Sequence, residues 1–377
     1  MKLRYKIGGG LLVLLAAGAI SLALVLSYNA PCEPASRVAD GQETMQAIRY
    51  RCYGSSDVLE LAAVEKPEPA ADEVLVQVHS ASVNPLDWHY MRGSPYFMRL
   101  MSGIGKPADP RLGVDFAGTV VAVGDAVTRF EPGDEVFGAA NGAFAEFVAV
   151  RDSGAVVLKP AQVTFEEAAA VPVAAITALQ ALRDKGRLGP GQKVLINGAS
   201  GGVGTFAVQI AKALGAEASG VCSTRNVDMV RSIGADHVFD YTREDYTESD
   251  RRYDLIVDMV GNHSLRDNLR VLEPDGVLVL VGGGKGNWIE PLKGPLKALL
   301  LSPFVEQEIV TLLARLDSGD MAALAELMET QAVVPVIDRR YPLGDLASAI
   351  EYSESGRARG KIIINMTGDS AATAERQ

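Results

Sequence analysis

The chain divides into two regions that differ in their pattern of apolar and polar residues. From Met45 to about Ala170, short alternating or apolar runs are separated by turn-forming stretches such as Glu131-Pro132-Gly133-Asp134. The runs Val74–His79 and Ala117–Val123 are typical of strands, so this part is predicted to be a compact barrel or sandwich. From about Val171 the pattern changes to strands alternating with helices. That alternation predicts a parallel sheet with crossover helices.

The second region contains five apolar runs that we expect as strands of the parallel sheet. They are Lys193–Asn197, Ala218–Cys222, His237–Phe239, Asp254–Asp258 and Val277–Val281. Helices are expected over much of residues 304–329. Val333–Ile337 and Lys361–Ile364 are predicted to be late strands that return to the first region.

The strongest motif lies where the first of these strands ends. Lys193–Asn197 runs into Gly198-Ala199-Ser200-Gly201-Gly202-Val203-Gly204, and an amphipathic run to Lys212 follows. Glycines let the backbone approach a pyrophosphate, and the N-terminus of the following helix supplies free N–H groups with a partial positive charge. We interpret Ala199, Ser200, Gly201, Gly202, Val203 and Gly204 as a dinucleotide-binding turn, because strand, turn, helix and second strand occur at the expected spacing.

The tip of the second strand indicates which dinucleotide binds. An NAD site needs an Asp or Glu about twenty residues after the turn, to accept hydrogen bonds from the ribose. This chain instead has Cys222-Ser223-Thr224-Arg225-Asn226 there. Ser223 and Thr224 can donate hydrogen bonds, and Arg225 can pair with a 2′-phosphate. NADP is therefore the predicted cofactor; the alternative is an exposed arginine in a polar loop.

Composition and charge narrow the classes of function. The chain has 377 residues and a net charge of −11, which argues against a nucleic-acid partner because phosphate binding needs a basic surface. Its three cysteines, Cys32, Cys52 and Cys222, form no Cys-x-x-Cys pair. We therefore expect neither a disulfide framework nor a structural zinc lobe with four cysteine ligands.

The N-terminus carries an uncharged run from Ile7 to Leu26, preceded by Lys2, Arg4 and Lys6. Twenty helical residues span roughly 30 Å, the thickness of a bilayer's hydrocarbon core, so we predict a single-pass transmembrane helix. A cleaved signal peptide is the alternative. The basic residues place the N-terminus inside, which would leave the body outside the cytoplasm, where nicotinamide cofactors are scarce. The side of the membrane on which the body lies is therefore left open.

From residue 45 to 366 the chain resembles the medium-chain dehydrogenase/reductase superfamily, in its zinc-independent quinone oxidoreductase and enone reductase branch. The matching segments are Val83-Asn84-Pro85-Leu86-Asp87, Gly113-Val114-Asp115-Phe116-Ala117-Gly118, Gly133–Gly138, Gly142–Phe147, Ala199–Gly204, Ser232–Asp236 and Gly360–Ile364. The resemblance implies an α/β protein, with a GroES-like β-rich catalytic domain beside a Rossmann domain that is a doubly wound parallel sheet. We assign residues 1–44 to the membrane anchor and linker, 45–170 plus 330–366 to the catalytic domain, 171–329 to the Rossmann NADP-binding domain and 367–377 to a tail.

The residues themselves favour the zinc-free branch. A catalytic zinc would need thiolate and imidazole ligands in the first two motifs, and neither Asn84–Asp87 nor Gly113–Asp115 contains a cysteine or histidine. Without a Lewis acid, reduction of an already activated acceptor fits better than alcohol oxidation. We therefore expect NADPH-dependent reduction of small-molecule quinones or conjugated enones. The alternatives are a zinc-free alcohol or aldehyde reductase and a non-catalytic NADP-binding membrane protein, and a homodimer is not excluded.

Several residues outside the glycine turn are candidates for the site. By resemblance, Asn84 lies near the nicotinamide and donates an amide hydrogen bond. Asp87 orders the local backbone, and His89 either donates a proton or is structural. The resemblance also places Thr177 at the nicotinamide, Tyr241 near the adenosine phosphate, and Val260 and Gly282 after strand ends that face the cofactor.

Overall fold

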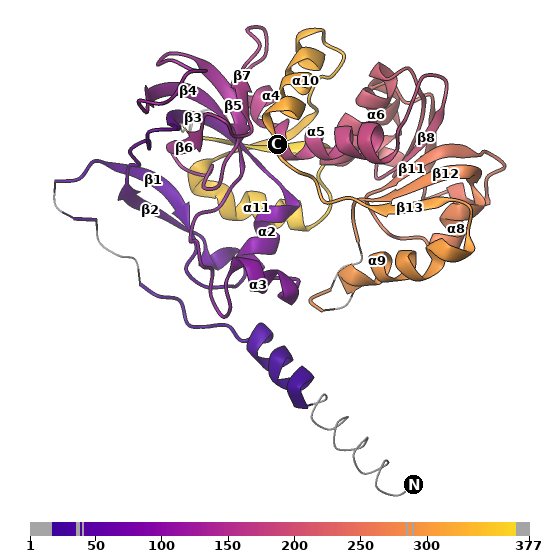
Figure 1. Cartoon of the computed structure of the whole chain (residues 1–377), viewed down its shortest axis with the longest axis horizontal. Helices are drawn as coiled ribbons and strands as arrows, with labels where there is room; N and C mark the ends of the chain where they lie inside the picture. The colour runs from indigo at the N-terminus through magenta and orange to yellow at the C-terminus, as the bar shows by residue number, and fades with distance from the viewer. Residues whose placement is uncertain (1–16, 35–37, 40, 284–285, 289, 367–377) are drawn as a thin grey trace, which may run out of the picture.

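The computed structural model describes residues 17–34, 38–39, 41–283, 286–288 and 290–366. Two sheets lie side by side (Figure 1), and each forms the centre of one domain. A separate two-stranded ribbon, made of β1 (Thr44–Arg49) and β2 (Glu60–Glu65), flanks the first sheet.

The first domain contains a seven-stranded sheet with the order β14-β15-β3-β4-β5-β7, and β6 pairs with β3. Only β14 and β15 are parallel; the other pairs are antiparallel. Its strands are β3 (Glu73–Val83), β4 (Asp115–Val123), β5 (Glu135–Ala139), β6 (Phe147–Arg151), β7 (Val156–Leu158), β14 (Ile337–Pro342) and β15 (Lys361–Asn365). Its helices are α2 (Pro85–Arg92), α3 (Arg99–Ser102), α4 (Phe165–Ala169) and α11 (Leu346–Glu354).

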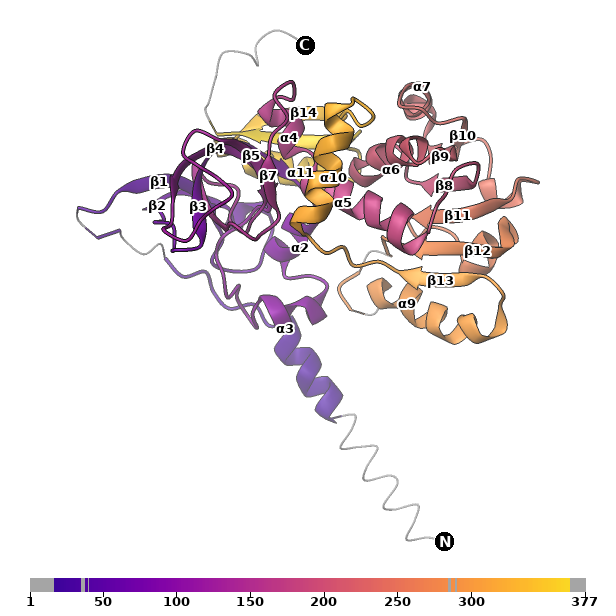
Figure 2. The same ribbon diagram turned by 45° about the horizontal axis from the view of Figure 1, so that its top comes forward.

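The second domain is a parallel six-stranded sheet with the order β10-β9-β8-β11-β12-β13, the strand order of a Rossmann fold (Figure 2). Its strands are β8 (Lys193–Asn197), β9 (Glu217–Cys222), β10 (His237–Asp240), β11 (Tyr253–Asp258), β12 (Leu272–Leu280) and β13 (Glu308–Thr311). Its helices are α5 (Pro172–Leu179), α6 (Gly202–Ala213), α7 (Val227–Ser232), α8 (Leu265–Arg270), α9 (Glu290–Leu301) and α10 (Ser318–Glu329). The predicted combination of a β-rich sheet and a Rossmann sheet is confirmed.

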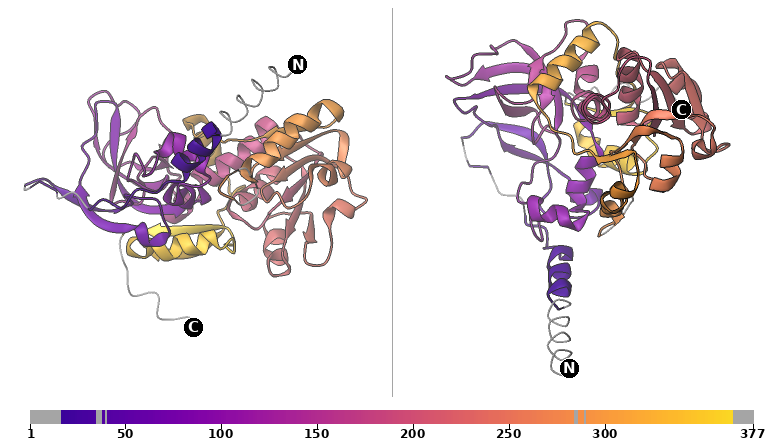
Figure 3. Two further views of the ribbon diagram at one scale, coloured as in Figure 1. Left: turned by 90° about the horizontal axis from the view of Figure 1, so that it is seen from below. Right: turned by 45° about the vertical axis from the view of Figure 1, so that its right-hand side comes forward.

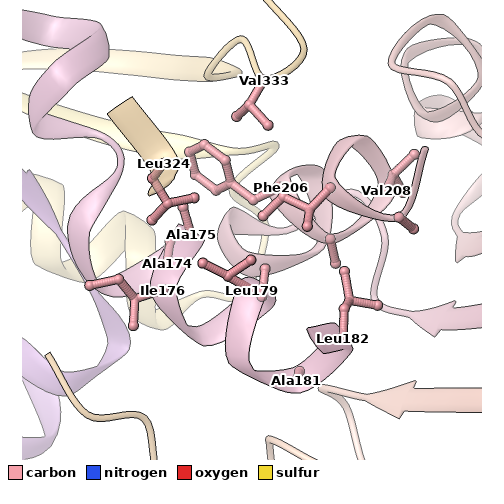
Figure 4. Packing of buried hydrophobic residues seen from close by; sticks show 14 of the residues in the cluster. Ala174, Ala175, Ile176, Leu179, Ala181, Leu182, Phe206, Val208, Leu324 and Val333 are labelled. Atoms are coloured by element: carbon pink, nitrogen blue, oxygen red, sulfur yellow. The ribbon is translucent and has the colours of Figure 1, made fainter. Parts of the chain in front are cut away.

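One apolar core joins the two domains. Buried side chains from α5, α6 and α10, among them Ala175, Phe206 and Leu324, pack against each other (Figure 4). The same cluster includes Phe137 of β5 and Val157 of β7, which belong to the first sheet. The helices that cover one face of the Rossmann sheet therefore also cover the edge of the β-rich sheet.

Two late elements differ from the sequence-based expectation. The strand expected at Val333–Ile337 begins only at Ile337, because Val334 exchanges hydrogen bonds with the side chain of Gln209 on α6 instead of with a strand. Within the region expected to be mainly helical, residues 308–311 form β13, which pairs with β12 at the edge of the Rossmann sheet.

The described part of the N-terminal segment does not form the predicted membrane anchor. Its described helix covers residues 17–27, and eleven residues span only about 16 Å. Its end meets the first domain (Figure 3). There the Arg99 guanidinium donates to the carbonyls of Leu26 and Tyr28 at 2.8 Å each. No helix in the described part of the chain is long and apolar enough to cross a membrane. The prediction of a single-pass membrane protein is therefore wrong; residues 7–16 of the expected span lie outside the described residues.

The cysteines also differ from the expectation. Cys32 and Cys52 form a disulfide across 20 residues, which fastens the segment after helix 17–27 to the β-rich domain. The cysteines were expected to form no disulfide framework because only their spacing in the sequence was visible. Their proximity depends on the path of the N-terminal segment along the domain. Cys222 is free and buried.

Candidate active site

The turn between β8 and α6 allows a ligand to approach the backbone closely. Gly198 has a φ of 96°, and Gly201 is the N-cap of α6. A Cβ on Gly204 would lie 2.1 Å from the Gly198 carbonyl oxygen, so only glycine permits this packing of helix on strand. The N–H groups of a helix's first turn have no acceptor within the helix and can hold an anion. This arrangement suits a pyrophosphate.

The remaining residues of the turn have different roles. Ala199 is fully buried, and its N–H donates to the Val221 carbonyl at 3.0 Å. Ser200 accepts a hydrogen bond from Asn226 Nδ2 at 2.9 Å, so its hydroxyl is oriented from the tip of β9. Val203 is half-buried and packs against the core. Asn226 was not among the predicted site residues.

The tip of β9 carries the predicted cofactor-selecting residues. Thr224 Oγ1 donates to Asp240 Oδ2 at 2.6 Å, so the hydroxyl hydrogen of Thr224 is already hydrogen-bonded to a carboxylate at the end of β10. Ser223 Oγ lies 3.3 Å from Asn226 Nδ2. Arg225 is exposed, and its Nη2 donates to the Arg357 carbonyl at 3.0 Å. Arg357 belongs to the loop before β15, so both domains meet at this tip.

Three further predicted residues lie at the carboxyl ends of neighbouring strands. The Tyr241 N–H donates to the Cys222 carbonyl at 3.0 Å, and its side chain is exposed. The Val260 side chain is close to the glycine turn, because a Cβ on Gly198 would lie 3.0 Å from Val260 Cγ2. A Cβ on Gly282 would lie 2.1 Å from the Met259 carbonyl oxygen. These positions line the edge where parallel sheets bind ligands.

A buried polar cluster lies where the two domains meet. Asn84 is the N-cap of α2 and is 2% exposed. Its Oδ1 accepts from Lys361 Nζ at 2.7 Å, and its Nδ2 donates to Asp115 Oδ2 at 2.8 Å. Because lysine only donates and a carboxylate only accepts, these two partners fix the orientation of the amide. The second amide hydrogen of Asn84 has no acceptor among the described residues.

Asp115, on β4, is the centre of this cluster. Besides Asn84, it accepts from Ser82 Oγ at 2.9 Å and from the Val173 N–H at 3.0 Å. Lys361 Nζ lies 3.4 Å from its Oδ2, and both side chains are almost fully buried. Val173 is on α5, where Thr177 Oγ1 donates back to the Val173 carbonyl at 2.7 Å. Asp115 thus links β4 to the helix that carries Thr177.

Lys361 connects the cluster to the cofactor turn. A Cβ on Gly202 would lie 3.3 Å from Lys361 Cδ, and Gly360 forms a parallel bridge with Gly201. Burial lowers the pKa of Lys361, and Asp115 counteracts that effect. Lys361 and Asp115 each belong to a motif of the sequence, but neither was predicted as a site residue. A lysine heading the apolar run Ile362–Ile364 is the signal that could have singled it out.

Asp87 caps α2 and also forms part of a cavity wall. Its Oδ2 accepts from the Asn84 N–H at 2.7 Å, and its Oδ1 has no hydrogen-bond partner among the described residues. Burial raises the pKa of Asp87 to about 7. The predicted role in ordering the backbone agrees with this capping position.

His89 is held in a structural contact. Its Nδ1 lies 2.7 Å from the Ser94 carbonyl oxygen, to which it donates, and its ring lies against Trp88. Burial lowers the pKa of His89, so the neutral form is favoured at neutral pH. The structure does not bring His89 to the cavity that Asp87 lines.

A cavity of about 410 Å³ lies beside this cluster, within the size range of small-molecule sites. One part of its wall is formed by Asp87, Gly113 and Val114. Its other walls come from both domains: Tyr50, Leu86, Tyr90, Met101, Ser102, Ala108, Asp109, Arg111, Leu112, Ala139, Ala140, Asn141 and Leu316. Within the described ranges, no group of three or more His, Cys, Asp or Glu side chains is placed to hold a metal ion.

Comparison with known proteins agrees with this geometry. Residues 70–161 match the model of the alcohol dehydrogenase GroES-like domain, and residues 233–364 match that of the zinc-binding dehydrogenase family. The chain is 34% identical over 343 residues to a chloroplastic quinone-oxidoreductase homolog of Spinacia oleracea, covering 85% of this chain and 98% of that protein. It is 31% identical over 355 residues to the 2-methylene-furan-3-one reductase of Solanum lycopersicum, covering 90% and 83%.

A solved structure shows the same arrangement. The quinone oxidoreductase from Coxiella burnetii superposes with a TM-score of 0.76 at 27% identity, covering 86% of this chain and all of that one. The predicted resemblance is therefore confirmed, and the protein is an oxidoreductase of a family that binds a nicotinamide cofactor. The chain belongs to the medium-chain dehydrogenase/reductase superfamily, in its zinc-independent quinone oxidoreductase and enone reductase branch.

Proposed function

We propose that this protein reduces quinones or conjugated enones with NADPH and without a metal ion. The observation that carries the proposal is the cavity next to the buried Asn84–Asp115–Lys361 cluster. Its wall has Gly113 and Val114 where a metal site would need imidazole or thiolate ligands. Such a cavity suits an acceptor that takes hydride without a Lewis acid. Two relatives are named for a quinone and for an exocyclic enone, which are acceptors of this kind.

The choice of NADPH over NADH rests on the surface around Arg225. No carboxylate follows β9 directly, and the acid of β10, Asp240, is engaged by Thr224 and Thr242. Arg225 reaches the backbone of Arg357, next to the place where the Arg339 guanidinium stacks 3.8 Å over the Tyr352 ring. A surface with several guanidinium groups favours a dianionic 2′-phosphate over a neutral hydroxyl.

The chain's own residues position the reactants and hold a proton. A bound nicotinamide would supply the hydride. The turn Gly201–Gly204 would hold its pyrophosphate, and the second amide hydrogen of Asn84 would be available to donate to a bound ligand. Asp87 lies in the cavity wall, and burial raises its pKa to about 7, so it can hold a proton near neutral pH and supply it where an oxyanion forms.

Turnover with a panel of acceptors tests the reaction. Purified full-length protein should oxidise NADPH with a naphthoquinone or a conjugated enone, and much more slowly with a saturated ketone. Dialysis against a chelator should leave the rate unchanged. The proposal is refuted if NADPH binds without turnover of any quinone or enone, or if activity disappears with the chelator and returns with zinc.

Binding of the two dinucleotides tests the cofactor. Arg225→Asp removes a charge-assisted contact and adds repulsion, so the Kd for NADPH should rise roughly 10- to 100-fold while the Kd for NADH changes little. Arg252→Asp is the matched control. Arg252 is an exposed arginine just before β11, so it lies at the amino ends of the strands of the same sheet, whereas Arg225 lies at their carboxyl ends. An unchanged Kd for NADPH in the Arg225 variant would rule out this phosphate site.

A further inference from the structure

The walls of the cavity select an uncharged ligand. Two charged side chains of the lining are paired with each other: Arg111 forms paired hydrogen bonds with Asp109, and Asn141 Nδ2 donates to the same carboxylate at 2.7 Å. Asp109 in turn raises the pKa of Arg111 and keeps it cationic. The other carboxyl group of the lining is that of Asp87, whose neutral form is favoured by burial, so the lining does not favour a charged substrate. Most of the remaining wall is apolar.

The outer edge of the cavity is apolar and exposed. Met101, on α3, lines the cavity and is 91% exposed; Leu316, from the other domain, lines it and is 38% exposed. Leu100 and Leu313 are neighbours of these two residues in the sequence and are also largely exposed. We call Leu100, Met101, Leu313 and Leu316 the rim. Exposed apolar groups that continue from a cavity are a mark of ligand contact.

Arg99 holds the rim's first half in place. It is 1% exposed, and its Nε donates to the Gly93 carbonyl at 2.7 Å. Its guanidinium lies over the rings of Tyr53 and Tyr96, at 4.5 and 4.6 Å from their centroids. The side chain thus anchors α3 at its first residue. Leu100 and Met101 are therefore presented to solvent by a fixed helix and not by a loose loop.

We propose that the natural acceptor is an uncharged quinone or enone with a long apolar tail, whose ring fills the cavity and whose tail lies across the rim. The inference rests on the proposed function. The identity of the occupant follows from two residues, Met101 and Leu316, which both line the cavity and are exposed to solvent. A chain that extends from a ring in the cavity can therefore lie against both of them. A tail there removes apolar surface from water on both sides, which strengthens binding with each buried methylene.

Two quinones with one ring test this inference. The probes are 2,3-dimethoxy-5-methyl-1,4-benzoquinone and the same ring with a decyl chain, both used below their aggregation limits without detergent. The decyl compound should have a KM at least tenfold lower. In Met101→Ser and in Leu316→Ser the ratio of the two KM values should fall toward one. Leu158→Ser, an exposed leucine on β7 that does not line the cavity, should keep the wild-type ratio.

The outcomes separate the two proposals. Reduction of both quinones with equal KM would overturn the tail and leave the proposed function intact, whereas reduction of neither would refute the proposed function. A tenfold ratio that survives in both rim variants would overturn the rim as the tail's binding site. So would a wild-type dimer that dissociates in Met101→Ser, because the rim would then bind a second copy of the chain.

Discussion

Replacing Lys361 with methionine tests whether the buried cluster depends on one positive charge. Methionine keeps most of the side chain's volume and its contact with Gly202, so the change removes little more than the ammonium group. Asn84 Oδ1 loses its 2.7 Å donor, and Asp115 loses its only cationic neighbour at hydrogen-bonding distance among the described residues. Asp115 keeps Ser82, Asn84 and the Val173 N–H.

The expected cost follows from these remaining contacts. Removing one partner of a buried ion pair typically costs about 3–5 kcal/mol, because the other charge stays buried without compensation. Asp115 retains three donors, and the 3.4 Å separation makes its contact with Lys361 weaker than that of Asn84. We therefore expect the lower end, about 3 kcal/mol of unfolding free energy, for Lys361→Met.

The assay is urea unfolding at pH 7.5 of four proteins: wild type, Lys361→Met, Asp115→Asn and the double variant. If the charges compensate each other, the double variant should be at least about 1 kcal/mol more stable than the sum of the single effects predicts. Additive costs, or a loss below about 1 kcal/mol for Lys361→Met alone, would refute the reasoning. Asp115→Asn keeps the shape of the side chain and so controls for packing.

Three other predictions concern Asp87, the glycine turn and the disulfide. The folded pKa of Asp87, about 7, exceeds the unfolded value, so its contribution to stability is largest at low pH and is lost as the pH rises through 7. The stability of wild type relative to Asp87→Asn should therefore fall by about 2–3 kcal/mol between about pH 5 and pH 8, and a flat difference would contradict the assignment. Gly204→Val should abolish NADPH binding and lower the Tm, because its Cβ would lie 2.1 Å from a carbonyl oxygen, whereas Gly189→Ala, whose Cβ would make an ordinary van der Waals contact with Gln192 Oε1 at 3.5 Å, should do neither. Cys32→Ser should cost about 3 kcal/mol, and a reductant should shift the Tm of wild type but not of this variant; equal shifts in both proteins would be evidence against the disulfide.

The elements that the sequence predicted best are those with a local signature. The glycine turn and the strands of the Rossmann sheet were visible because apolar periodicity and glycine spacing are properties of neighbouring residues. The strand β13 was not predicted, because Glu308–Thr311 lies within residues 304–329, which were expected to be mainly helical. The late strand was misplaced because the side chain of Gln209, far away in the sequence, occupies the backbone of Val334.

The buried polar cluster shows which part of the site could not be predicted from the sequence. Asn84 and Asp87 could be predicted from one motif, and Lys361 belongs to another motif 277 residues away from Asn84. Nothing in either segment indicates that the two side chains touch. His89 was predicted either to donate a proton or to be structural, and its contact with the Ser94 carbonyl, five residues further on, fits the structural role. The apolar run at the N-terminus led to the wrong prediction of a membrane helix for a related reason. Its composition does not indicate that Arg99 binds the end of helix 17–27.

The first sheet is assembled from both ends of the chain, and this has a consequence for synthesis. The edge of β3 that pairs with β15 stays open until the last part of the chain leaves the ribosome, roughly 280 residues later. At about 5–20 residues per second, that interval is on the order of 15–60 s. During this interval the Rossmann domain can already fold, while Asp115 still lacks the ion pair with Lys361. A nascent chain stalled before residue 361 would therefore expose an unpaired strand and an uncompensated carboxylate, and chaperones would have to protect the catalytic half for longer than the half made after it.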